Sequence, residues 1–103
     1  MIEKKQFYIN GKWVDPINKN ELDVIDPSNE EVCAVISLGD SEDTDLAVES
    51  AKKAFPMWSS TSKEERIKLL EKLYEIYKSR WNKMAESISL EMGSPIDLSL
   101  IHI

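Results

Sequence analysis

The sequence predicts an α/β segment in which a β-hairpin and further short strands are followed by two to three amphipathic α-helices. Three observations support this prediction. An Asn-Gly turn signal lies between short apolar runs near the N-terminus. Before Gly39 the apolar residues fit the two-residue period of strands, and after Gly39 they recur every three or four residues, as in helices. The 103 residues are 42% hydrophobic and 31% charged, a balance typical of globular domains.

The N-terminal part of the chain contains the strand signals. The stretch "QFYINGKWVD" predicts a hairpin around Asn10-Gly11, because both residues tolerate the positive φ that a tight turn requires. Residues 22–25 and 31–37 predict two more extended segments, joined by the turn residues 26–29. The second of these segments is apolar on both faces, so we expect it to be covered on both.

The first helix is predicted to begin after Gly39. Asp40 is the expected N-cap, with Asp43 at the N3 position, in an imperfect capping box. Apolar residues then recur at helical spacing as far as Phe55, and Pro56 is expected to end the helix, because proline lacks the N–H that a helix interior requires.

A longer helical pattern follows. Thr61 and Glu64 predict a capping box at its start, and Gly93 with Pro95 predicts its end. Residues 79–82 are weaker helix formers, so a break into two helices is expected there. The apolar stripe of this pattern consists of Ile67, Leu70, Leu73 or Tyr74, Tyr77, Trp81, Met84, Ile88 and Met92.

This stripe is wider than one packing face requires. Leu69, Ile76 and Leu90 lie off its centre line, which is typical of a helix buried on more than one side. At ~25 cal/mol per Å² and roughly 150–250 Å² per aromatic side chain, leaving two or three aromatic residues in water forfeits several kcal/mol. We therefore expect the helices to pack against a partner surface that these 103 residues do not supply.

Charge and cysteine content narrow the function classes. The net charge is −6, which argues against a nucleic-acid partner, since phosphate binding needs a clustered basic face. Cys33 is the only cysteine, so an internal disulfide is excluded and a reducing, cytoplasmic environment is expected. The first ten residues resemble neither a signal peptide nor a transit peptide, and no apolar stretch is long enough to span a bilayer.

The sequence yields no catalytic residue and no cofactor-binding residue. Cys33 lies within a predicted strand, and the only histidine is His102, so a structural role is favoured over nucleophilic catalysis. The three glycines are far apart and form no phosphate-binding motif. The acidic run 40–45 lacks the pattern of a calcium loop and is interpreted as helix capping.

Taken in order, several stretches are similar to the N-terminal segment of the aldehyde dehydrogenase superfamily. They are "YINGKWVD", "VIDPSNEEVCAVISLGDSEDTDLAVESAKKAF", a Trp before "TSKEERIKLLEKL", and "SLEMGSP". Residues 6–97 are therefore expected to form the N-terminal segment of the cofactor-binding domain of such an enzyme. Residues 98–103 depart from the pattern and are interpreted as a non-native tail.

The resemblance implies a longer parent enzyme that oxidises an aldehyde to a carboxylic acid. A Rossmann-like domain would bind NAD or NADP, and the helices of this segment would pack on it. A catalytic cysteine would form a thiohemiacetal, hydride would pass to the nicotinamide, and activated water would hydrolyse the thioester. Those residues would all lie beyond this chain, so the fragment alone is expected to be inactive and to bind no cofactor. The parent is expected to be a homodimer or a homotetramer.

The resemblance also implies a monovalent cation site. Several members of the family hold potassium or sodium through residues that match Val24, Ile25 and Glu91. Strand-end carbonyls and a carboxylate would supply the oxygen ligands. Glutamate stands at position 91 where other members have aspartate.

Two alternatives remain open at this point. The chain could be a small stand-alone interaction module that uses its helical stripe to bind a partner or itself. A stand-alone enzyme is disfavoured, because the nucleophile, the base and the cofactor loop are all missing from the pattern.

Overall fold

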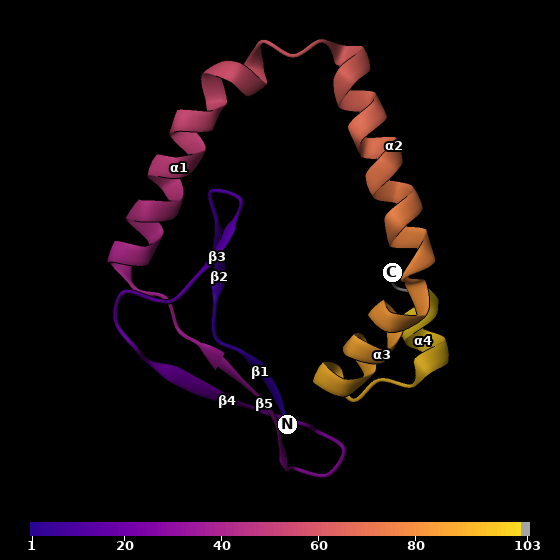
Figure 1. The fold of residues 1–103 in the computed structure, drawn as a ribbon. Helices are drawn as coiled ribbons and strands as arrows, with labels where there is room; N and C mark the ends of the chain where they lie inside the picture. Colours follow the sequence, from indigo (N-terminus) through magenta and orange to yellow (C-terminus); the bar gives the residue numbers. More distant parts are fainter. Residues whose placement is uncertain (102–103) are drawn as a thin grey trace. The chain divides into compact units, whose positions relative to one another are not determined.

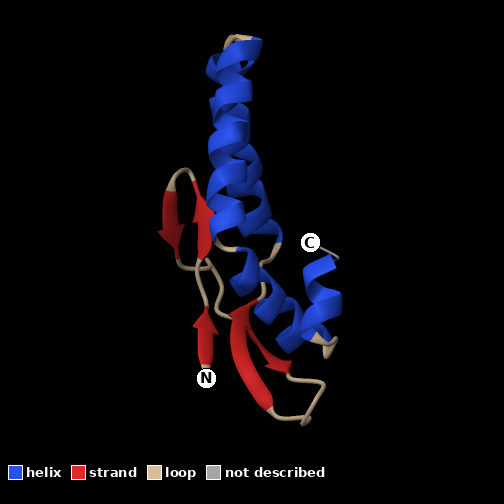
Figure 2. Ribbon diagram, turned by 90° about the vertical axis from the view of Figure 1, so that its right-hand side faces the viewer, coloured by secondary structure: helices blue, strands red, loops and turns tan. Residues whose placement is uncertain are grey.

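The computed structural model describes residues 1–101, and they form strands followed by helices, as Figures 1 and 2 show. The elements are β1 (Ile2–Lys4), β2 (Phe7–Ile9), β3 (Lys12–Val14), β4 (Glu21–Ile25), β5 (Val32–Ser37), α1 (Ser41–Ser59), α2 (Lys63–Ser79), α3 (Trp81–Met92) and α4 (Ile96–Ile101). The predicted α/β class is confirmed. The number of helices is one more than the two to three expected, because α4 was not predicted.

The chain divides into two units, and each is described by itself. The first unit contains residues 1–25 and 32–60, and the second contains residues 26–31 together with the described residues from 61 onward. The first unit therefore holds all the strands and α1, whereas the second holds α2, α3 and α4.

A three-stranded sheet in the order β1-β5-β4 organises the first unit. β4 runs antiparallel to β5, with a register shift between Val24 and Ile25, and β1 runs parallel to β5 with Ile2 opposite Ala34. β5 is the central strand, and its Val35 is 7% exposed. The sequence did not predict β1, because its three residues are all exposed and carry no apolar alternation.

The hairpin formed by β2 and β3 confirms the Asn-Gly prediction. Asn10 and Gly11 have φ values of 53° and 73°, the positive values that a two-residue I′ turn requires. The two faces of the hairpin differ. Tyr8 lies opposite Trp13 on the exposed face, with ring centroids 5.2 Å apart in a T-shaped arrangement. Phe7 lies on the half-buried face, where its ring comes within 3.4 Å of the position that a Cβ on Gly39 would occupy.

The helix α1 begins as predicted and ends later than predicted. Asp40 is the N-cap, and its capping box with Asp43 is fully formed. The expectation that Pro56 ends the helix is wrong, since α1 continues to Ser59. Pro56 begins the last turn, where the helix is exposed and the missing hydrogen bond is a local loss. The hydroxyls of Ser59 and Ser60 donate to the carbonyls of Pro56 and Met57, at 3.1 and 2.7 Å, which satisfies the end of the helix.

In the second unit, α2 starts one residue later than the predicted cap. Ser62, not Thr61, is the N-cap, and Glu65, not Glu64, completes the capping box. Both pairs fit the same motif, so the sequence pattern alone does not fix the register. The predicted break between two helices is confirmed at Arg80, which separates α2 from α3 and has a non-helical φ of −110°.

The end of α3 also agrees with the sequence. Gly93 adopts the left-handed conformation, with φ 71°, and its N–H donates to the carbonyl of Ser89. A Cβ at position 93 would lie 3.0 Å from Cγ of Pro27, a tight contact that adds to the preference for glycine set by the positive φ.

Helix α4 was not predicted, and the expected boundary after Asp97 falls inside it. Ser99 is 1% exposed, and its hydroxyl lies 2.8 Å from that of Ser94. His102 and Ile103 lie outside the described residues. The interpretation of residues 98–103 as a non-native tail therefore stays a prediction.

The apolar core is very small. Among residues 1–101, Val35 and Ala85 are the only buried hydrophobic residues, and one belongs to each unit. In the part of the chain that the structure describes, no helix combines the length and the apolar character needed to cross a membrane.

Candidate interaction surface

The most prominent feature of the second unit is the apolar half of α2. At 3.6 residues per turn, the large apolar side chains of α2 fall within one half of the helix circumference. They are Ile67, Leu69, Leu70, Leu73, Tyr74, Ile76 and Tyr77. Lys63 and Arg66 enter this half only near the N-terminal end of the helix. We call this half of the helix the α2 apolar surface.

The α2 apolar surface is open to solvent. No residue of α2 is buried, and its side chains from Ile67 to Ile76 that belong to this surface are between 42% and 63% exposed. Full burial of one such side chain is worth roughly 1.5–3 kcal/mol. Covering the exposed parts of six of them would supply several kcal/mol, which is comparable with the total stability of a domain, ~5–15 kcal/mol. This exposed half of α2 is a candidate docking surface.

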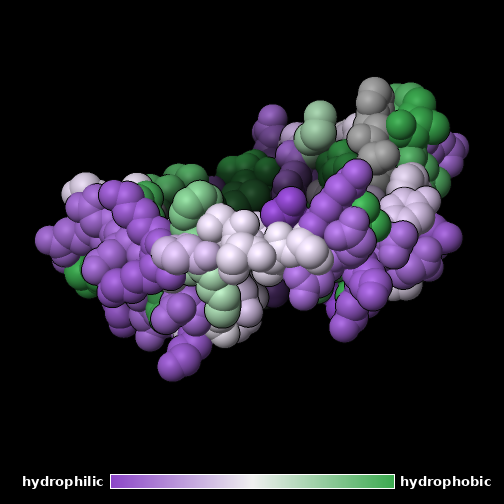
Figure 3. Space-filling model, turned by 90° about the horizontal axis from the view of Figure 1, so that it is seen from above, coloured by the Kyte–Doolittle hydropathy of each residue, from purple (hydrophilic) through white to green (hydrophobic). Residues whose placement is uncertain are grey.

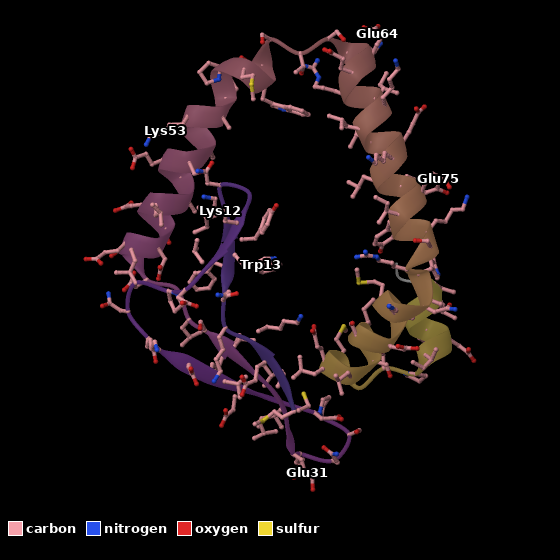
Figure 4. The ribbon with its side chains drawn as sticks, viewed as in Figure 1. Lys12, Trp13, Glu31, Lys53, Glu64 and Glu75 are labelled. Atoms are coloured by element: carbon pink, nitrogen blue, oxygen red, sulfur yellow. The ribbon has the colours of Figure 1, made fainter. Side chains whose placement is uncertain are left out.

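The opposite half of α2 is charged and suited to water. It carries alternating acids and lysines, including Glu64 and Glu75, which Figure 4 labels on this helix. Lys78 lies 3.7 Å from Glu75, and its Nζ is 5.4 Å from the ring centroid of Tyr74. Because the charged half is solvated, one side of α2 is available for docking and the other is not.

The first unit has exposed aromatic residues of its own. Tyr8 and Trp13 are 64% and 65% exposed on the hairpin, and Phe55 is 65% exposed on α1. Figure 4 shows Trp13 on the hairpin, next to Lys12. Figure 3 shows hydrophobic side chains at the surface among hydrophilic ones on the face it presents. The Tyr8–Trp13 pair is therefore a candidate contact surface of the first unit.

The helix N-termini are closed to anions. The carboxylate of Asp40 caps α1, and hydrogen bonds from the Asn18 side chain and the Asp43 backbone hold its pKa below the ordinary value. Glu65 plays the corresponding part in α2, where the backbone N–H and the hydroxyl of Ser62 lower its pKa. Each of these two N-termini already faces a carboxylate, and a second anion would be repelled.

The residues present do not fit a dinucleotide cofactor. Gly11 serves the hairpin turn, Gly39 leaves room for the Phe7 ring, and Gly93 ends α3. Gly39 directly precedes the N-cap of α1, but the Asp40 carboxylate already accepts the N–H groups that a phosphate would need there. We therefore derive no step of nicotinamide chemistry through the described residues.

Cys33 is placed as a structural residue. It lies in β5, and its Sγ–H donates to the carbonyl oxygen of Val24 on the neighbouring strand, at 3.4 Å. It lies within a strand and not at a helix N-terminus, which is where a thiol is commonly activated. Among residues 1–101, no three His, Cys, Asp or Glu side chains are arranged to hold a metal ion.

The residues of the predicted cation site fall in different units. Val24 and Ile25 end β4 in the first unit, at the register shift, and Val24 O already accepts the Cys33 thiol. Glu91 is exposed in the last turn of α3, in the second unit. The monovalent cation therefore stays a prediction.

Sequence reasoning missed a groove in the second unit. It has a volume of about 320 Å³ and lies where loop residues Asp26 and Ser28 meet Glu86 and Ser89 of α3. The Asp26 carboxylate accepts hydrogen bonds from the backbone and hydroxyl of Ser28, which lower its pKa. Some sixty residues separate the loop from the helix, so no local pattern could have joined them.

The fold and the exposed surfaces together define a class of protein segment. It is an α/β segment whose described residues offer docking surfaces and no assembled reaction centre. Comparison with known proteins identifies the family of such a segment.

The aldehyde dehydrogenase family model matches residues 13–103. A curated relative, 3-succinoylsemialdehyde-pyridine dehydrogenase from a Pseudomonas species, is 43% identical over 96 residues. That alignment covers 93% of this chain and 20% of the relative. The match extends into the residues for which a departure from the pattern was expected.

Solved structures agree with the family match. The crystal structure of an aldehyde dehydrogenase from Bartonella henselae superposes with a TM-score of 0.96 and 54% identity, over 98% of this chain and 21% of that one. A variant of aldehyde dehydrogenase C from Pseudomonas syringae, in complex with NAD+ and octanal, gives a TM-score of 0.91 and 38% identity, over 93% of this chain and 20% of that one.

The chain belongs to the aldehyde dehydrogenase family. It spans about one fifth of the length of the relatives it matches. The resemblance of the sequence to this family is thereby confirmed, as is its correspondence to the N-terminal part of those enzymes.

Proposed function

We propose that this chain forms the N-terminal segment of an NAD(P)-dependent aldehyde dehydrogenase, an enzyme that oxidises an aldehyde to a carboxylic acid. One observation supports this above the others. Nearly the whole chain superposes on one fifth of an aldehyde dehydrogenase with a TM-score of 0.96. Relatives of known structure contain NAD+ or a related nucleotide, and one of them also contains octanal.

The role of the segment in such an enzyme is structural. Its α2 apolar surface and the aromatic groups of the first unit are covered by the remaining chain of the enzyme. The catalytic nucleophile, the general base and the nucleotide cradle belong to that remaining chain. The placement of Cys33 within a strand and the acidic caps of α1 and α2 support this division of roles.

The proposal extends to the compartment, the oligomeric state and the oxidant of the whole enzyme. It works in the cytoplasm, as the single cysteine favours, and it assembles as a homodimer or a homotetramer. Either NAD+ or NADP+ serves as the oxidant. Nucleic acid is not a partner, since the net charge of −6 disfavours phosphate binding.

A chimeric enzyme tests the proposal. Residues 1–97 of this chain replace the matching segment of the Bartonella henselae aldehyde dehydrogenase, and NAD+ or NADP+ reduction is measured with a panel of aldehydes. We expect a soluble enzyme with activity near that of the unaltered one, because the segment supplies a matching fold and no reacting group. An insoluble or inactive chimera beside an active control enzyme would contradict the proposal.

A second candidate function is a stand-alone interaction module. The observation that favours it is the completeness of the local structure, since both long helices carry full capping boxes. Urea unfolding and light scattering of the 103-residue chain distinguish the two candidates. A cooperative transition with a defined oligomer favours the module, whereas aggregation or gradual melting favours a segment that needs the rest of its enzyme.

A further inference from the structure

The tip of the β2–β3 hairpin is an exposed Asn-Gly pair. Asn10 and Gly11 are both exposed, and no heavy atom lies within 4 Å of the position that a Cβ on Gly11 would occupy. No neighbouring side chain therefore crowds this side of Gly11 at the turn. Asn10 is also the only asparagine of the chain that a glycine follows.

We propose that Asn10 is a site of spontaneous deamidation, and that opening of the β2–β3 hairpin controls the rate of this reaction. The inference does not depend on the function proposed above. It depends on the chemistry of an asparagine that precedes a residue without a Cβ.

The reaction needs only water. The main-chain nitrogen of Gly11 attacks the side-chain carbonyl carbon of Asn10 and loses its proton, and the side-chain amide nitrogen leaves as ammonia. The product is a five-membered succinimide. Water then adds to one of its two carbonyl groups and breaks a C–N bond, giving either aspartate or isoaspartate. No electrons are transferred, so no oxidant or reductant is involved.

The other asparagines form a control set within the same molecule. Asn18, Asn20, Asn29 and Asn82 precede Lys, Glu, Glu and Lys. The side chains of those following residues crowd the attacking nitrogen, whereas Gly11 does not. Differences in buffer, temperature and pH act on all five alike, so their relative rates report the local chemistry.

The hairpin restrains the reaction. Its turn holds Asn10 in the left-handed conformation, with φ 53°, and closing the succinimide requires rotation about the Cα–C bond away from the turn value. The strands have only three residues each, and their outer face carries the exposed pair Tyr8–Trp13. A short two-stranded hairpin is marginally stable, so it opens often enough for the rotation to occur.

The main product would change the first unit. In isoaspartate the main chain passes through Cβ, which adds one atom between residues 10 and 11. The two-residue turn then no longer matches the pairing of Ile9 with Lys12, and the Tyr8–Trp13 contact is lost with it. The new carboxylate would lie in a groove of about 250 Å³ beside α1 that Lys12, Lys53 and Glu49 also line, and Glu49 already pairs with Lys53 at 3.0 Å.

The experiment uses the 103-residue chain at mildly alkaline pH. Peptide mapping by mass spectrometry follows the small mass gain at each asparagine, and an isoaspartate-specific methyltransferase identifies the linkage. We expect Asn10 to react first, with isoaspartate as the larger product. An Asn10 that keeps its amide while another asparagine loses its own would overturn the proposal.

Control of the rate by hairpin opening is tested with Trp13→Ala. Loss of the aromatic pair should raise the ratio of the Asn10 rate to the Asn20 rate roughly two- to tenfold. Tyr77→Ala is the matched control, because it deletes the T-shaped pair Tyr77–Trp81 in the other unit and should leave that ratio unchanged. Circular dichroism verifies that each variant stays folded, because unfolding of the whole chain would release Asn10 from the turn without any selective opening of the hairpin. An unchanged ratio in Trp13→Ala, or a native rate equal to the rate in urea, would overturn this part.

Discussion

The two long helices, α1 and α2, both begin with a capping box. The box of α1 is also hydrogen-bonded to another segment of its unit, which is the difference between them. In α1 the capping residue Asp43 is buried and also accepts a hydrogen bond from the backbone of Ile17, at 3.0 Å. In α2 the cap residues Ser62 and Glu65 are exposed, and their side chains hydrogen-bond to each other across the capping box. A capping box therefore shows where a helix begins and not whether that helix is attached to the rest of the protein.

The helix bodies differ in the same sense. The start of α1 is fixed to the loop between β3 and β4, because Asn18 also donates to Asp40, at 2.7 Å. The apolar half of α2 has no buried residue. The first helix is thus anchored by hydrogen bonds within its unit, while the second depends on hydrophobic burial that these residues do not provide.

The largest expected effect comes from a charge on the α2 apolar surface. Leu70→Asp in the chimeric enzyme should abolish soluble, active protein, because a buried unpaired carboxylate destabilises by several kcal/mol. In the 103-residue chain the same change should cost only about 1 kcal/mol, mostly through the lower helix propensity of aspartate, since Leu70 is 63% exposed there. Activity assays and urea melts measure the two cases.

Glu71→Lys, on the charged half of α2, is the control for this prediction. It should leave the chimera active. If Leu70→Asp had the same effect in the chimeric enzyme as in the 103-residue chain, the α2 apolar surface would not be a docking surface.

The next largest effect is expected at the capping box of α1. Asp43→Ala should destabilise the first unit by about 1–2 kcal/mol, because it removes the cap partner and the acceptor of the Ile17 N–H. Urea denaturation followed by circular dichroism measures the change. Asp43→Asn, which keeps one acceptor oxygen, should recover part of the loss. If Asp43→Ala lowered the free energy of unfolding by less than an ordinary surface substitution does, the start of α1 would be no more firmly attached than the start of α2.

Acid should weaken both helix starts. Hydrogen bonds lower the pKa of Asp40 and of Glu65 in the folded chain, so their stabilisation is fully present above the unfolded carboxyl value and is lost as pH falls through the folded one. Helix content should therefore be constant near neutrality and fall at acidic pH, below roughly 4. Circular dichroism against pH measures this. Asp40→Asn combined with Glu65→Gln should flatten the profile, and an unchanged profile would contradict it.

The smallest effect concerns the register of the α2 cap. Ser62→Ala should destabilise the helix by about 1 kcal/mol, because it removes the oxygen that accepts the N–H of Glu65. Lys68→Ala, on the exposed side of the same helix, serves as the control and should be nearly neutral, since alanine is an excellent helix former. Circular dichroism measures the helicity of the two variants, and Ser62→Ala should be the less helical. The opposite order would show that Ser62 is not the N-cap of α2.

The features predictable from the sequence are those that nearby residues determine. The hairpin at Asn10-Gly11, the cap at Asp40, the break near Arg80 and the end of α3 at Gly93 all follow from a few adjacent residues. Local chemistry also explains the two errors. The capping motif fits at either Thr61 or Ser62, and a proline in an exposed final turn does not end a helix.

The features that could not be predicted depend on distant residues. The pairing of β1 with β5 joins segments thirty residues apart, and Ile2 alone carries no strand signal. The contact of Pro27 with Gly93 and the bond from Ile17 to Asp43 are of the same kind. The predicted cation ligands Val24, Ile25 and Glu91 came from family resemblance, and no local pattern would have selected them.

The open half of α2 also bears on the order in which the enzyme is made. An N-terminal segment leaves the ribosome first, and translation adds about 5–20 residues per second. Relatives are about five times longer than this chain, so its hydrophobic side chains would wait tens of seconds for their covering partners. During that interval the exposed half of α2 would be open to aggregation, which is the hazard that chaperones counter for nascent chains in general.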